Sequence, residues 1–108
     1  MKSLVLLTLL ISLLFAEKSI YVKYRGMVKV DNQQLKHQSI QSSSLVTDMY
    51  YDSANKYLIV KLKETYYHYC GISSNVVSNW INSSSLGSYY LNEIKGNYDC
   101  RIYPMPKY

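Results

Sequence analysis

The run from Tyr57 to Gly71 constrains the fold of this chain more than any other part of the sequence. Its first half alternates in the way typical of a half-buried strand. One face of this strand carries Leu58, Val60 and Leu62, and the other carries Tyr57, Ile59, Lys61 and Lys63. A turn at Glu64-Thr65 then returns the chain as a second strand from Tyr66 to Gly71. The sequence therefore predicts a β-hairpin.

The register of this hairpin decides which tyrosines are exposed. A two-residue loop at Glu64-Thr65 predicts four facing pairs, namely Lys63 with Tyr66, Leu62 with Tyr67, Lys61 with His68, and Val60 with Tyr69. We favour this loop because it collects the apolar side chains on one face together with Tyr67 and Tyr69. A slip of one residue would instead place those two tyrosines among the lysines.

Further strands are expected before the hairpin. The segment 21–30 alternates around Gly26, which predicts a strand or a pair of short strands. The polar stretch 31–44 is expected to be a connection that Leu35 and Ile40 anchor onto the core. Residues 45–51 are apolar enough for another strand, and residues 52–55 form a turn of short polar side chains.

Helices are expected after the hairpin. Residues 73–75, Ser-Ser-Asn, offer caps for a helix whose core-facing stripe is Val76, Val77, Trp80 and Ile81. A second short helix is expected from Leu86 to Lys95 and ends at Gly96. The predicted fold is therefore α+β, with a small antiparallel β-sheet packed against one or two short helices.

The first sixteen residues have the pattern of a secretory signal peptide. A positive start is followed by an apolar run from Leu4 to Phe15, and the small residue Ala16 precedes Glu17. About twelve apolar residues are too few for a membrane-spanning helix, which needs roughly 20. We expect cleavage after Ala16 and an exported product, periplasmic or secreted, with no membrane span after cleavage.

The net charge of +5 falls to +4 when the segment 1–16 is removed with Lys2. This mild excess is compatible with a polyanion or a membrane surface as partner, and equally with ordinary solubility. The two cysteines, Cys70 and Cys100, are expected to form one disulfide, because an exported domain folds in an oxidising compartment. Neither cysteine has the spacing to His37 or His68 that a zinc site needs, so no metal or other cofactor is predicted.

Several residues together resemble the KTSC domain family. The resemblance is carried by Ser43-Ser44, Tyr51-Asp52, Tyr67 and Tyr69, Asn92, Ile94-Lys95-Gly96 and Tyr98. The family is found at the C-terminus of some lysyl-tRNA synthetases and as stand-alone bacterial proteins, and this connection implies RNA binding. We expect the KTSC-like domain over residues 43–103, and an N-terminal strand region with its polar connection over residues 17–42.

The sequence favours a non-catalytic binding module for a protein, a peptide or an envelope glycan. Thirteen tyrosines supply wide contact surfaces with a polar tip. The predicted binding residues are Lys61, Lys63, Tyr66, Tyr67, His68, Tyr69 and Lys95. The same lysines and tyrosines could bind RNA phosphates and bases, but export separates the protein from RNA.

A small hydrolase built on His68 is the third hypothesis. The chain has two histidines, and it contains neither a nucleophile-elbow motif nor a phosphate-binding glycine loop. Lys95 has a simpler role at the end of a helix, where a cation complements the helix dipole. The sequence therefore predicts no enzymatic activity.

Overall fold

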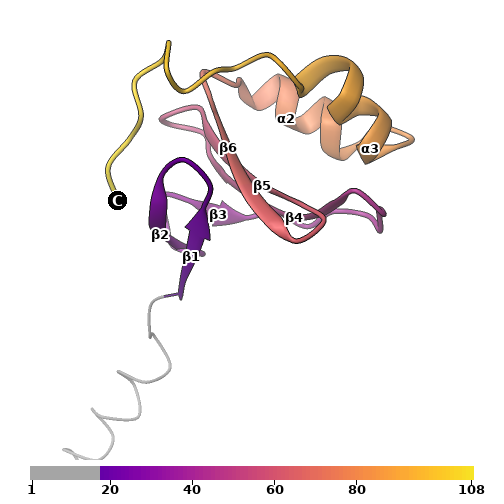
Figure 1. The fold of residues 1–108 in the computed structure, drawn as a ribbon. Helices are drawn as coiled ribbons and strands as arrows, with labels where there is room; N and C mark the ends of the chain where they lie inside the picture. The colour runs from indigo at the N-terminus through magenta and orange to yellow at the C-terminus, as the bar shows by residue number, and fades with distance from the viewer. Residues whose placement is uncertain (1–17) are drawn as a thin grey trace, which may run out of the picture.

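A computed structural model describes residues 18–108, and the predicted signal peptide at residues 1–16 lies outside them. The described part is a curled six-stranded sheet with two short helices and is mostly β (Figure 1). The strands are β1 Lys18–Val22, β2 Gly26–Val30, β3 Lys36–His37, β4 Val46–Asp52, β5 Tyr57–Leu62 and β6 Thr65–Cys70. The helices are α2 Ser74–Ile81 and α3 Leu86–Tyr89, which continues into a π-helical turn, η1, Tyr90–Ile94.

The sheet is mixed, whereas the sequence predicted an antiparallel one. The strand order is β2-β1-β6-β5-β4-β3, and β1 runs parallel to β6, with Val22 facing Tyr66. The remaining neighbours are antiparallel. The parallel contact arises because β1 joins the sheet beside the last strand of the chain. The two-residue strand β3 was not predicted, and it pairs with the end of β4.

The predicted hairpin is formed by β5 and β6, but its register is wrong by one residue on each strand. The loop is Lys63-Glu64, so Leu62 faces Thr65 and Lys61 faces Tyr66. Lys63 takes the left-handed backbone conformation that this tight turn requires, with φ of 56°. The shift preserves the predicted faces, because Val60 lies opposite Tyr67 and Leu58 lies opposite Tyr69.

A buried core lies on each face of the sheet. The face toward the helices is covered by α2, α3 and η1, whose buried side chains include Trp80, Leu86 and Ile94. The curl of the sheet brings the β1–β2 hairpin against the opposite face, where Val22 and Leu35 pack in a second core. The second core contains Tyr57 and Ile59, which are fully buried. The expectation that β5 is half-buried is therefore wrong.

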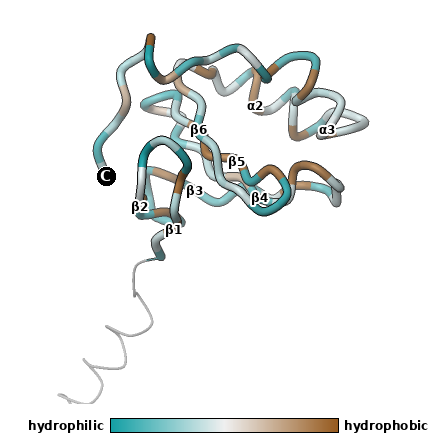
Figure 2. Tube along the Cα trace, in the orientation of Figure 1, coloured by the Kyte–Doolittle hydropathy of each residue, from teal (hydrophilic) through white to brown (hydrophobic). Residues whose placement is uncertain are grey.

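The helices follow the predicted pattern. The Ser73 side chain caps α2 by accepting a hydrogen bond from the Val76 amide at 3.4 Å. The Trp80 indole donates to the Leu86 carbonyl at 3.0 Å, which ties α2 to α3. Figure 2 shows that the turn between β1 and β2 is hydrophilic. Gly96 follows the last turn with φ of 83°, as its role as a helix end requires.

The predicted disulfide between Cys70 and Cys100 is confirmed, and the two α-carbons are 4.7 Å apart. It joins the end of β6 to the segment that follows η1. Leu35 is fully buried, and Ile40 packs on the core between the sheet and the helices. Both residues therefore anchor the polar connection, as expected. Among residues 18–108, no helix is long and apolar enough to cross a membrane.

Candidate binding site

The outer edge of β6 is covered only at its two ends. Near its start, the Tyr66 carbonyl accepts a hydrogen bond from the Lys23 amide at 2.9 Å, and at its end the Cys70 amide donates to the Tyr98 carbonyl at 2.9 Å. Alternate residues of an antiparallel strand direct their backbone groups to the same side, so His68 points its amide and carbonyl to this edge too. No residue of the described chain pairs with them there. Although β6 is an internal strand of the sheet, its outer edge is therefore open at His68, beyond the single β1 contact at Tyr66.

A groove lies along this open edge, with a volume of about 730 Å³. We refer to it as the β6 groove. Its walls are the turn between β1 and β2 on one side and the segment after η1 on the other, with β6 as the floor. The lining residues are Tyr24, Tyr67, His68, Tyr69 and residues 96–101.

Two tyrosines that line the β6 groove, Tyr24 and Tyr67, lie against a lysine beside it. Tyr24 is 80% exposed and has a φ of 71°, which is rare outside glycine. The Lys23 ammonium lies 5.3 Å from the centre of the Tyr24 ring and 5.7 Å from that of Tyr67. These distances are in the range of cation–π attraction, so one cation draws the two rings together.

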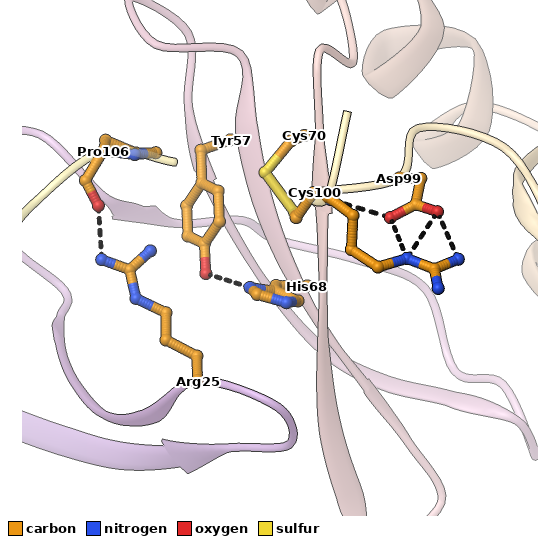
Figure 3. Close-up of a disulfide and its surroundings, with 8 residues drawn as sticks. Arg25, Tyr57, His68, Cys70, Asp99, Cys100 and Pro106 are labelled. Carbon is orange, nitrogen blue, oxygen red and sulfur yellow. Dashed lines mark hydrogen bonds and ion pairs between the residues drawn. A yellow bond between two sulfur atoms is a disulfide. The ribbon is translucent and has the colours of Figure 1, made fainter. Parts of the chain in front are cut away.

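His68 is held as a neutral hydrogen-bonding group. The Tyr57 hydroxyl and His68 Nδ1 are hydrogen-bonded at 2.9 Å (Figure 3). Burial lowers the pKa of His68, and the nearby Arg25 guanidinium lowers it further, while the Asp99 carboxylate acts in the opposite direction. The bond to Tyr57 occupies Nδ1 and fixes the orientation of the imidazole ring.

Asp99 and Arg101 form an ion pair at the rim of the β6 groove. Arg101 Nη2 lies 2.7 Å from Asp99 Oδ2, and the hydrogen bonds from Arg101 lower the pKa of Asp99 to about 2. The two charges of this pair compensate each other, and the Lys23 ammonium lies beside the groove, against the Tyr24 and Tyr67 rings. Among the described residues, no group of three or more His, Cys, Asp or Glu side chains could hold a metal ion.

The structure divides the seven predicted binding residues among four places. Tyr67, His68 and Tyr69 line the β6 groove, although the Tyr69 hydroxyl is already hydrogen-bonded to that of Tyr90 at 2.6 Å. Lys63 is exposed in the hairpin turn, and Lys95 is exposed after η1. The seven residues therefore do not form one surface.

Tyr66 and Lys61 lie on the other face of the hairpin. The Tyr66 hydroxyl donates to Asp48 at 2.7 Å, and the Lys61 ammonium lies 5.3 Å from the Tyr66 ring centre. His37 Nε2 contacts the other oxygen of Asp48 at 2.7 Å. Burial acts to raise the pKa of Asp48, but the hydrogen bonds from Tyr66 and His37 outweigh it and hold that pKa below its ordinary value.

Sequence reasoning did not include Lys23, Tyr24 or the segment 96–101 in the site. Gly26, two residues after Tyr24, was a visible signal for a turn, but nothing local indicates that this turn lies next to β6. The contact depends on the parallel pairing of β1 with β6, which joins segments more than forty residues apart.

Comparison with known families identifies residues 42–98 as a match to the model of the KTSC domain. The chain belongs to the KTSC domain family. The match runs from just before β4 to Tyr98, so it contains the helices, three strands and the floor of the β6 groove. Tyr24 and Cys100 lie outside the matched residues, so in this KTSC protein flanking segments complete the groove. A comparison with curated proteins gives no match.

Proposed function

We propose that this KTSC protein is an exported, non-catalytic binding module whose β6 groove takes an extended peptide segment of a protein partner. The observation that carries the proposal is the open sheet edge at His68, bordered by the tyrosines of the groove. An unpaired strand edge offers backbone hydrogen bonds to an extended peptide, and neighbouring side chains then select its sequence. Tyrosine suits this role because its large ring loses little conformational freedom on binding.

The charge of the groove favours a peptide with acidic residues. The Lys23 ammonium lies against two tyrosines that line the groove, and the whole chain carries a net charge of +5. Export is supported by the apolar N-terminal segment and by the disulfide, since disulfides persist in oxidising compartments. Fractionation of a bacterial host that expresses the full chain should give a periplasmic or secreted product that begins at Glu17, and a cytoplasmic, uncleaved product would refute export.

A hydrolase would need a nucleophile and an orienting acid beside His68. His68 Nδ1 is instead engaged by the Tyr57 hydroxyl, which supports a binding role. RNA binding, suggested by the synthetase-linked members of the family, would draw on Lys61, Lys63 and Lys95. Their separation from the β6 groove supports the peptide proposal instead.

Selection of displayed twelve-residue peptides on the disulfide-bonded protein tests the proposal. We expect peptides that bind at micromolar concentrations and lose at least tenfold in affinity with Tyr67→Ala or Lys23→Ala. Tyr21→Ala is the matched control, because Tyr21 is 65% exposed on the same hairpin but does not line the groove. Failure to select any peptide, or equal losses in the control, would refute the peptide site. Salt-sensitive binding of single-stranded RNA that Tyr67→Ala abolishes would favour the nucleic-acid function instead.

A further inference from the structure

The chain beyond the disulfide folds back over the second core. In Figure 1 this segment, drawn in yellow, leaves the helices and runs toward the β1–β2 hairpin. Its last residue, Tyr108, donates a hydrogen bond from its hydroxyl to Asp52 Oδ2 at 2.6 Å. The Tyr108 ring lies 5.8 Å from the Tyr57 ring, centre to centre. Asp52 is only 2% exposed, so the phenol reaches a carboxylate inside the protein.

Arg25 completes the contact from the β1–β2 turn. Its guanidinium carbon lies 4.9 Å from the centre of the Tyr57 ring and 5.3 Å from that of Tyr108. Its Nη2 donates to the carbonyl of Pro106 (Figure 3). Its Nη1 is buried without a hydrogen-bond partner in the described structure. We call Arg25, Asp52 and Tyr57 the aromatic cradle.

The segment that fills the aromatic cradle is attached at few points. Residues 101–105 and 107 are exposed, and Met105 is 44% exposed. After Tyr103 no backbone-to-backbone hydrogen bond holds the segment. The segment contacts the cradle through the Pro106 carbonyl and the Tyr108 side chain, which is partly buried against the second core.

We propose that the aromatic cradle is a second peptide-binding site, specific for an extended segment in which a tyrosine follows two residues after a proline. Residues 103–108 occupy it within the same chain, and an equivalent segment of a protein partner displaces them. Each part of the cradle has a separate role in this recognition. Asp52 accepts a hydrogen bond from the phenol, Arg25 binds the proline carbonyl, and the Tyr57 ring packs against the incoming ring.

The buried carboxylate also defines what the cradle rejects. The hydrogen bonds from Asn55 and Tyr108 to Asp52 keep its pKa below the ordinary value, although burial acts to raise it. Asp52 therefore stays ionised at neutral pH. A phosphorylated or sulfated tyrosine would bring a second anion against it and lose the donor hydroxyl, so only an unmodified phenol fits.

The test uses a fluorescent, C-terminally amidated hexapeptide with the sequence of residues 103–108, titrated into full-length variants. The resident segment competes with the peptide, so wild-type protein should bind weakly. Tyr108→Ala removes the resident anchor and should bind the peptide at least tenfold more tightly. Tyr108→Phe keeps the ring and should give an intermediate gain. Lys107→Ala, at an exposed position of the same segment, is the matched control and should behave as wild type.

The specificity of the cradle is tested with altered peptides. A hexapeptide with alanine in place of its last tyrosine, or with phosphotyrosine there, should not bind the Tyr108→Ala protein. Equal binding to wild type and Tyr108→Ala, or retained binding of the alanine peptide, would overturn the proposal. In wild-type protein, millimolar hexapeptide should shift the NMR signals of Arg25 and Tyr57, and unchanged signals would also refute it. Tyr67→Ala should leave hexapeptide binding intact. The test of the aromatic cradle therefore does not depend on whether the β6 groove binds a peptide.

Discussion

Removal of the disulfide should cost this protein a large part of its stability. Cys70 and Cys100 are 30 residues apart. The chain-entropy relation for a loop of this length gives a stabilisation of about 3.6 kcal/mol at 25 °C. Proteins of this kind are stable by about 5–15 kcal/mol, so the crosslink supplies a quarter or more of the total. The variant that tests this value is Cys70→Ala/Cys100→Ala, which leaves no free thiol.

Urea unfolding followed by tryptophan fluorescence measures the effect, because Trp80 is fully buried. With an m-value of about 1.5 kcal/mol/M, the unfolding midpoint should fall by about 2.4 M. Reduced wild-type protein is the control, since it lacks the crosslink but keeps the buried Cys70 sulfur. If both reduced wild type and the double variant lose less than about 1 kcal/mol, the loop-closure reasoning is wrong.

Three further predictions follow from single residues. An NMR titration should give a His68 pKa below 6.5 that rises in Arg25→Gln. Because the unfolded chain then binds the proton more readily, the free energy of unfolding should fall as the pH drops from 6.5 through the folded pKa. A measured His68 pKa above 6.5 contradicts this. Gly71→Ala should lose about 1–2 kcal/mol in thermal unfolding, because Gly71 has a φ of 71° and a β-carbon there would lie 2.8 Å from the Tyr103 ring; an unchanged melting temperature would refute the strain. Leu35→Ala should lose about 2–5 kcal/mol in urea unfolding, since Leu35 is fully buried, and a loss below 1 kcal/mol would place it outside the core.

Local patterns predicted most of the elements but not their neighbours. The cap at Ser73, the apolar stripe around Trp80 and the end at Gly96 are all local signals, and the helices formed where they indicated. The parallel contact between Val22 and Tyr66 has no such signal. It depends on where two distant segments meet, which a periodicity cannot encode.

The error at β5 has a chemical reason. Tyrosine beside lysine resembles a solvent-facing side of a strand, yet Tyr57 is fully buried. Its hydroxyl reaches His68, and its ring is covered by Arg25, so the polar tip is satisfied inside the protein. The hairpin register failed for a similar reason, because the turn depends on Lys63 adopting a positive φ that its residue type does not suggest.

The sequence predicted one part of the candidate site, the part on β6. The aromatic run of β6 drew attention to Tyr67 and His68, and both line the groove. The opposite wall could not be derived, because residues 96–101 reach β6 through the disulfide and through the backbone bond from Cys70 to Tyr98. Whether the groove binds a peptide stays a prediction.

Removal of the disulfide should affect the two proposed binding sites differently, because of where Cys100 lies. Cys100 lines the β6 groove, whereas the segment that fills the aromatic cradle begins three residues later. Without the disulfide, the groove loses the covalent attachment of one wall to β6. The tether of Tyr108 lengthens only from eight residues, counted from Cys100, to fourteen, counted from the buried Ile94. Effective concentration falls roughly as the −3/2 power of tether length, so the resident segment weakens by about twofold. The double alanine variant, where folded, should therefore lose groove binding and change hexapeptide binding only slightly.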